Sequence, residues 1–339
     1  MINWTYLSKY LKLINIYYNL YIIMQFTILR EWINDNMINW SYLSKYSSNI
    51  DFLNDNINKL DWPGLSCNIY AIEILEKNID KINWYNLSSN INAMSILTQN
   101  QDKIVWDCFS KNINGLELLK QNVDKIDWFW FSIYCSDIDF LEKHIDKIDW
   151  NCISSNKNAI KLLEKYSSKI NWKFLSSNIN AIHLLEQNID KIDWYYLSSN
   201  SNAIHILEKN LDKINWNKLS MNSGSIYIIK NNLNKIDWDT FVYLSPHTDV
   251  IIQNLNKLNN WNYLLGNQFA IEIIENNFDK FTEWEIFSLN KNIFTYDYEK
   301  IKNAKSNITE GLAMYFLHPN KIQKFLEIND NIDDYEYFK

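Results

Sequence analysis

Tryptophan recurs at a fixed interval of 22 residues along most of this 339-residue chain. Ten tryptophans keep this register, and two more follow at spacings of 23: Trp40, Trp62, Trp84, Trp106, Trp128, Trp150, Trp172, Trp194, Trp216 and Trp238, then Trp261 and Trp284. A fixed period of this length is typical of a solenoid, in which each repeat is a small unit that packs on its neighbours. The period therefore favours a stacked array over a single globular core.

Each repeat carries the pattern of two short helices. In the unit WYYLSSNSNAIHILEKNLDKIN, residues 194–215, the apolar residues lie three or four positions apart, which is a helical spacing. We expect the first helix to begin at the tryptophan, with the preceding Asn or Asp as its N-cap, and to run through Leu-Ser-Ser. The second helix is expected to be capped by Asn202 and to end at Asn210.

Other positions of the repeat have expected structural roles. With only 5 glycines in the chain, Asn at the two breaks is expected to take the left-handed conformation. The tryptophan is expected to fill the seam between repeats, and the Asp-Lys pair before the next tryptophan to remain in solvent. A serine at one fixed place is expected to close the first helix by bonding the backbone: Ser88, Ser110, Ser132, Ser154, Ser176, Ser198 and Ser220.

These elements predict an all-α fold, an α/α solenoid of about eleven helix-turn-helix repeats. Two-turn helices are not stable alone, so the stability must come from packing between repeats. At helix spacings of 8–10 Å the array would be a rod or arc on the order of 100 Å long. Residues 1–39 are expected to form an N-terminal cap, 40–294 the repeats and 295–339 a helical C-terminal cap. The apolar stretch 11–29 predicts a buried capping helix rather than a membrane span, because Asn15, Asn19 and Gln25 interrupt it.

The repeat resembles units found in many paralogous proteins of giant DNA viruses of amoebae, whose consensus is close to NPNAIxLLEKNPDKINWxxLSxN. Here Asn90-Ile91-Asn92 and Asn178-Ile179-Asn180 stand where that family has Asn-Pro-Asn. The C-terminal segments Ile293-Phe294 with Tyr296-Asp297-Tyr298, and His318-Pro319-Asn320-Lys321-Ile322, are similar to the family's closing IFxxDY and HPxRI segments. The resemblance covers about 40–326. It implies a viral protein acting in an infected host cell, and it carries over no catalytic residue.

The sequence predicts no catalytic residue, no cofactor and no metal site, and hence a protein that is not an enzyme. It lacks GxSxG, Walker-type, HExxH and GxGxxG motifs. His183 and His205 occupy the same place in adjacent repeats, roughly 10 Å apart, whereas the ligands of one zinc ion lie about 2 Å from it. Cys108 and Cys152 are expected to be exposed or half-exposed thiols, too far apart for a disulfide. Unpaired cysteines and the absence of an export signal favour an intracellular location, in host cytoplasm or a viral factory.

Two variable surfaces are candidates for partner binding. The first comprises the aromatic residues at the two positions after the tryptophans, here Tyr85, Phe129, Trp130, Phe174, Tyr195 and Tyr196. Tyr and Trp dominate interface hot spots, although these rings could instead cover neighbouring helices. The second is the position after Ala-Ile in the second helix, which changes from acidic to basic or aromatic and is expected to line a concave groove: Lys161, His183, His205 and Tyr227.

The function that this pattern favours is a scaffold or adaptor that binds a protein partner, from host or virus. The alternative is an RNA-binding solenoid that reads one base per repeat. A net charge of −7 and the absence of a repeated arginine disfavour it, because nucleic-acid binders gain affinity from basic surfaces. A structural role in the virion or replication compartment stays open. No membrane partner is expected.

Overall fold

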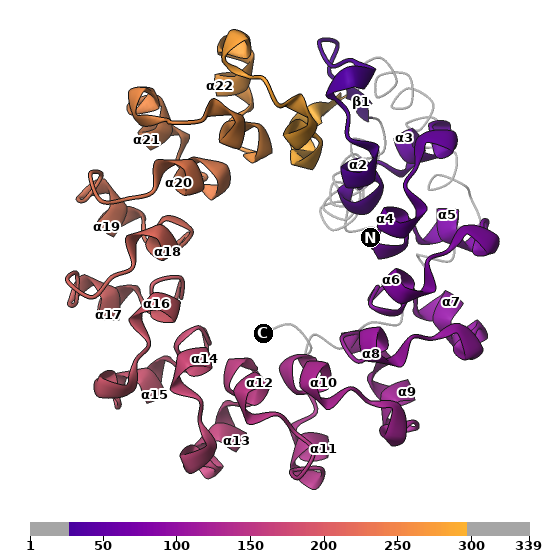
Figure 1. Ribbon diagram of the computed structural model, residues 1–339, viewed down its shortest axis with the longest axis vertical. Coiled ribbons are helices and arrows are strands. Elements are labelled where there is room, and N and C mark those ends of the chain that lie inside the picture. The colour runs from indigo at the N-terminus through magenta and orange to yellow at the C-terminus, as the bar shows by residue number, and fades with distance from the viewer. Residues whose placement is uncertain (1–26, 297–339) are drawn as a thin grey trace, which may run out of the picture. The chain divides into compact units, whose positions relative to one another are not determined.

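The computed structural model describes residues 27–296, and its contacts divide the chain into two compact units. One unit is Ile33–Asn292. The other combines the segments before and after it, of which 27–32 and 293–296 are described. The predicted α/α solenoid is confirmed in the unit of residues 33–292 (Figure 1). The expected capping helices, in 11–29 and 295–339, lie mostly outside the described residues. Where they are described, at 27–29 and 295–296, the chain forms strand and not helix.

Twelve first helices begin at the periodic tryptophans, as predicted. They are α2 (Trp40–Tyr46), α4 (Trp62–Cys67), α6 (Trp84–Ser88), α8 (Trp106–Phe109), α10 (Trp128–Tyr134), α12 (Trp150–Ser155), α14 (Trp172–Ser176), α16 (Trp194–Leu197), α18 (Trp216–Ser220), α20 (Trp238–Leu244) and the 3-10 helices η10 (Trp261–Gly266) and η12 (Trp284–Leu289). The predicted caps are present: the side chains of Asn83, Asp127 and Asp193, for example, accept backbone N–H groups of the first turn.

The second helices follow after a short turn. They are α3 (Ile50–Asp55), α5 (Ile72–Glu76), α7 (Met94–Gln99), α9 (Leu116–Lys120), α11 (Ile138–Lys143), α13 (Ile160–Lys165), α15 (Ile182–Glu186), α17 (Ile204–Glu208), α19 (Ile226–Lys230), α21 (Thr248–Ile252) and α22 (Ile271–Asn276). In Figure 1 the first helices, from α2 to α20, form the inner layer of the curved array, and the second helices form its outer layer.

Short 3-10 helices were not anticipated. Most repeats that have one place it at the Asp-Lys segment: η2 (Ile57–Lys59), η3 (Ile79–Lys81), η4 (Gln101–Lys103), η6 (Val123–Lys125), η7 (Ser167–Lys169), η8 (Ile189–Lys191), η9 (Leu255–Lys257) and η11 (Phe278–Lys280). Others are η1 (Asp35–Met37), η5 (Ile113–Gly115) and η13 (Lys291–Ile293). The lysine of this segment is exposed, as expected, and it also lies over an indole ring. Lys213 Nζ, for example, lies 4.8 Å from the ring centre of Trp194, and eight further repeats share this cation–π contact.

Two expectations about asparagine are wrong. The second helix of the Trp194 repeat has Ala203 as its N-cap residue, with no side-chain bond, while Asn202 donates its amide to the carbonyl of Ile179 in the preceding repeat. No described residue adopts a positive φ. Asn210 instead turns its side chain back and donates to the Ile206 carbonyl four residues earlier. Side-chain bonding to a nearby carbonyl thus ends the helix without a left-handed residue.

The tryptophans do not form the centre of the core. Most of the twelve are half-buried, whereas leucines such as Leu87, Leu175 and Leu197 on the first helices are fully buried. On the second helices, Leu185 and Leu207 are also fully buried. The lysine contact covers part of the indole. The tryptophan therefore lies at the edge of the core of its repeat, and the smaller aliphatic side chains fill the interior.

In most repeats a serine on the first helix is hydrogen-bonded to the next repeat. Ser176 Oγ donates to the Trp172 carbonyl at 2.7 Å, as predicted, and accepts the backbone N–H of Asp193 at 3.0 Å. The second bond crosses to the following repeat and was not foreseen. It recurs at Ser44, Ser66, Ser88, Ser110, Ser132, Ser154, Ser198 and Ser220.

A buried asparagine ladder runs beside the serines. Asn178 donates its side-chain amide to the carbonyls of Ser154 and Asn156, both at 3.1 Å, and Asn200 does the same to the following pair. The members are 1–4% exposed: Asn68, Asn90, Asn112, Asn156, Asn178, Asn200, Asn222, Asn267 and Asn290. Where the asparagine is present, the ladder fixes a first helix against the preceding one. It therefore also fixes the spacing of the side chains that these helices display.

The array in residues 33–292 closes on itself. Helix η12 contacts both η1 and α2, and the backbone N–H of Asn39 donates to Ser288 Oγ at 2.7 Å. This bond is the one that joins consecutive repeats elsewhere, so the last repeat takes the place before the first. The open rod or arc that we expected does not form. A rotation of about 30° per repeat is enough to bring twelve repeats round a full turn.

Two short strands were missed in the prediction of an all-α chain. In the second unit, β1 (Thr27–Leu29) pairs antiparallel with β2 (Phe294–Tyr296), with Ile28 opposite Thr295. The backbone N–H of Arg30 also donates to the Ile293 carbonyl at 3.1 Å. Because these strands precede and follow the array in the chain, their pairing joins the two segments that flank it.

Candidate interaction surface

The first candidate surface, here called the inner stripe, comprises the two positions after each tryptophan on the first helices. Residues at the first position are exposed, including Tyr85 (60%), Phe129 (48%) and Tyr195 (47%). At the second position Trp130, Phe174 and Tyr196 are half-buried, while Cys108 and Cys152 are buried and Tyr42 and Tyr263 are exposed. The two interpretations of these aromatics, partner binding and cover of neighbouring helices, therefore apply to different positions. A ring at the first position is presented to solvent, and a ring at the second position also covers its neighbours.

The inner stripe is continuous because the second position of one repeat lies beside the first position of the repeat before it. Asn86 donates its side-chain amide to the Pro63 carbonyl at 2.8 Å across such a step. The side chain of Cys108, across the next step, raises the pKa of Tyr85. Side chains of consecutive repeats thus form a single surface.

One group of five residues, here called the lysine–tyrosine cluster, spans three repeats of the inner stripe. It comprises Lys173, Phe174, Tyr195, Tyr196 and Lys218. The ring centres of Phe174 and Tyr196 are 6.2 Å apart, and those of Tyr195 and Tyr196 are 5.3 Å apart. Lys173 Nζ lies 5.3 Å from the ring of Tyr196, and Lys218 Nζ lies 4.9 Å from that of Tyr195. The sequence predicts the aromatic residues of this cluster but not their contacts with the two lysines.

A second aromatic group lies on α10. Phe129 and Trp130 meet edge to face with ring centres 5.0 Å apart, and Trp130 stacks on Tyr134 at 6.3 Å. Lys111 of the preceding repeat places Nζ 3.9 Å from the Trp130 ring centre. Tyr134 is exposed and is the last residue of α10, one position before the C-cap residue Cys135.

The second candidate surface lies on the outer layer and not in a concave groove. His183 Nε2 contacts Glu164 Oε1 at 2.7 Å, and His205 Nε2 contacts Glu186 Oε1 at the same distance. Each pair joins a repeat to the one before it. Lys161 is exposed, and Tyr227 is 70% exposed. The direction in which the array curves decides which helices lie outside. The helical pattern of the sequence does not predict that direction.

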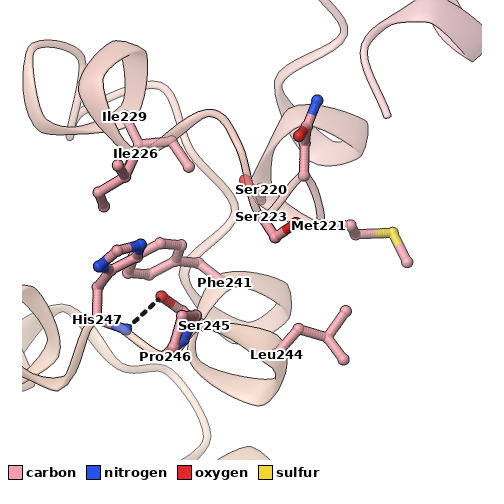
Figure 2. Close-up of a pocket in the computed structure, with 11 residues that line it drawn as sticks. Ser220, Met221, Ser223, Ile226, Ile229, Phe241, Leu244, Ser245, Pro246 and His247 are labelled. Carbon is pink, nitrogen blue, oxygen red and sulfur yellow. Dashed lines mark hydrogen bonds between the residues drawn. The ribbon is translucent and has the colours of Figure 1, made fainter. Parts of the chain in front are cut away.

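Among the described residues there are shallow pockets but no cluster of metal-binding side chains. Residues 27–296 contain no group of three or more His, Cys, Asp or Glu side chains that could hold a metal ion. A shallow pocket, shown in Figure 2, lies between the Trp216 and Trp238 repeats, with Ile229, Phe241 and His247 among its lining residues. Its ≈ 280 Å³ include space open to solvent, so it is smaller than typical ligand pockets of about 300–1,000 Å³.

That pocket marks a break in the asparagine ladder. The Trp238 repeat has Ser245 where the ladder would place an asparagine, and Ser245 Oγ accepts the backbone N–H of His247 (Figure 2). No ladder amide from this repeat reaches the carbonyls of Ser220 and Asn222. The Trp40 and Trp128 repeats have the same substitution, with Ser47 and Cys135. The ladder is therefore interrupted at three seams, one of which is the seam that closes the array.

The cysteines differ from expectation. Cys108 and Cys152 are 3% and 5% exposed, so they are buried and not half-exposed, because the second position packs against the preceding repeat. The four cysteines are unpaired, as predicted. Burial raises the pKa of the Cys152 thiol to about 12 and that of Cys135 to about 11, while Cys67, which is half-buried, has a smaller increase.

We expect Cys67 to react with a thiol reagent in the native protein well before the other three cysteines. The thiolate is the reactive form, and burial disfavours it at Cys135 and Cys152. Alkylation at pH 8 followed by peptide mass spectrometry would measure the order. The neutral thiols of Cys135 and Cys152 stabilise the fold below pH about 9, and this contribution is lost as the pH rises towards 11–12. Faster labelling of Cys152 than of Cys67 would contradict this prediction.

Comparisons of the chain with known protein families, curated proteins and solved structures found no match. Among the described residues, no helix has the length and apolar character needed to cross a lipid bilayer. The class of protein that the fold defines is therefore an α-helical repeat protein, and the functional argument depends on the surface of this chain alone.

Proposed function

We propose that this chain is a non-enzymatic scaffold that binds a protein partner through the aromatic side chains of the inner stripe. The observation that carries the proposal is the set of exposed and half-exposed rings on the first helices α10, α14 and α16, at Phe129, Trp130, Phe174, Tyr195 and Tyr196. Tyr and Trp are enriched among the few residues that dominate interface energies. The ladder and serine hydrogen bonds hold the helices that carry these rings in fixed positions. The chain therefore loses little conformational entropy when a partner binds.

The resemblance of the repeat to proteins of giant DNA viruses supports a further part of the proposal. On that basis the scaffold acts inside an infected host cell, and its partner is a host factor or another viral component. The same resemblance includes no known activity, which agrees with a binding role.

The test is affinity capture with the full chain from lysate of virus-infected amoebae, compared with the double variant Trp130→Ala/Tyr196→Ala. We expect a partner retained by the wild type to be lost from the double variant. Tyr227→Ala is the matched control, because it removes an exposed ring from the outer layer. A partner list unchanged in Trp130→Ala/Tyr196→Ala would exclude the inner stripe, and loss confined to Tyr227→Ala would assign binding to the outer layer.

A further inference from the structure

We propose that the lysine–tyrosine cluster binds an acidic, extended segment of the protein partner. This inference rests on the proposed function and specifies the chemistry of the partner. Lys173 and Lys218 flank the rings of Tyr196 and Tyr195 at distances of 5.3 and 4.9 Å, so positive charge and aromatic surface alternate across three repeats.

The charge of the cluster differs from that of the rest of the stripe. The chain has a net charge of −7, and the stripe has acidic residues elsewhere, at Asp107, Asp239 and Glu285. Near the cluster, the carboxylate of Asp193 accepts the backbone N–H of Tyr196 at 3.2 Å and therefore serves as a helix cap. A segment rich in Asp or Glu would be attracted here and repelled at the other positions, which gives both affinity and register.

The shape of the cluster suits an extended segment. Lys173 and Lys218 belong to repeats that are two apart, which places them at most about 20 Å apart at helix spacings of 8–10 Å. An extended chain advances about 3.3 Å per residue, so about six residues would bridge the two ammonium groups. Apolar or aromatic side chains between the carboxylates would lie on Phe174, Tyr195 and Tyr196.

An acidic peptide fits this cluster better than a nucleic acid does. The cluster contains two lysines and no arginine, and acidic side chains occupy equivalent stripe positions on other repeats. Nucleic-acid binding sites need several cations along the backbone path, because neutralisation of phosphates supplies most of the affinity.

The experiment is a fluorescence anisotropy titration of the full chain against three labelled probes: an eight-residue peptide alternating Asp with Phe, the same peptide with Lys in place of Asp, and an eight-nucleotide single-stranded RNA. We expect the acidic peptide to bind most tightly, and Lys173→Glu/Lys218→Glu to weaken it at least about tenfold. Lys143→Glu/Lys209→Glu makes the same charge change at the ends of outer helices, and we expect less than a twofold effect. Far-UV circular dichroism of both variants checks that they are folded.

The proposal is overturned if the acidic peptide does not bind, if both double variants weaken it equally, or if the RNA binds more tightly than the peptide. Capture of the cellular partner separates this result from the proposed function. If Lys173→Glu/Lys218→Glu retains the partner while Trp130→Ala/Tyr196→Ala loses it, the aromatic stripe binds and the acidic chemistry is wrong. Partner retention by both variants contradicts both proposals.

Discussion

Replacement of Asn178 with alanine is expected to lower the free energy of unfolding by about 3–6 kcal/mol. The Asn178 side chain donates to the carbonyls of Ser154 and Asn156 and accepts the backbone N–H of Asn180. Asn178 is 2% exposed, and Ser154 and Asn156 are equally inaccessible. The substitution leaves two buried carbonyls without this partner, at about 1–3 kcal/mol each, and also removes the acceptor of a part-buried N–H. Urea denaturation followed by circular dichroism would measure the change.

The matched control is Asn180→Ala, two residues away. Asn180 also donates an amide to a carbonyl of the preceding repeat, that of Lys157 at 2.9 Å, but this bond is exposed. Water can replace an exposed donor, so we expect a loss below about 1 kcal/mol. Equal losses at Asn178 and Asn180 would show that burial of the ladder does not set its energy.

The second large effect is expected at Gly115, which occupies a place where other repeats have alanine. A methyl group on Gly115 would lie 2.4 Å from Phe109 Cζ, far inside normal contact distance. Phe109 is fully buried and stands where most other repeats have leucine or isoleucine. The larger ring of Phe109 therefore occupies the volume that the missing methyl leaves. Gly115→Ala should destabilise the protein by about 1–3 kcal/mol, because overpacked cores strain their neighbours.

A double-mutant cycle tests this compensation. Phe109→Leu alone leaves a cavity and should cost about 1–2 kcal/mol. Phe109→Leu combined with Gly115→Ala restores the side chains of the ordinary repeat, and we expect its stability to lie within about 1 kcal/mol of the wild type. The coupling energy between the two positions should then be at least about 1 kcal/mol. Strictly additive losses would show that the two residues do not share one volume.

The parts of the fold that depend on neighbours in sequence were predictable. The first helices begin at the tryptophans because a cap residue, a helical spacing of apolar residues and a closing serine all lie within one short segment. The role of Ser176 in its own helix follows from the same local logic. Its bond to Asp193 could have been found too, because a polar residue that recurs every 22 positions and is buried must find partners in the next repeat.

The parts that depend on angles between repeats were not predictable. The asparagine of the ladder was interpreted as a turn residue, since the sequence shows its period but not its depth. A small rotation relates each repeat to the next, and its sign decides which of the two helices lies inside and which outside. The placement of His183 and Tyr227 follows from that sign, which no residue pattern encodes. The same rotation, accumulated over the array, decides whether the repeats stay open or meet.

The contact between Asn39 and Ser288 joins residues that are 249 positions apart in the chain. The other serine bonds that join repeats span 17 positions, as the bond between Asp193 and Ser176 does. Closing the longer loop costs about 2 kcal/mol more in chain entropy, so this contact should form late in folding. Once it has formed, no repeat is terminal, and fraying from an end, which is the usual route of local unfolding in linear arrays, is suppressed. The native chain then has the topology of a circle, in which any turn between repeats could serve equally well as the point where a permuted polypeptide begins.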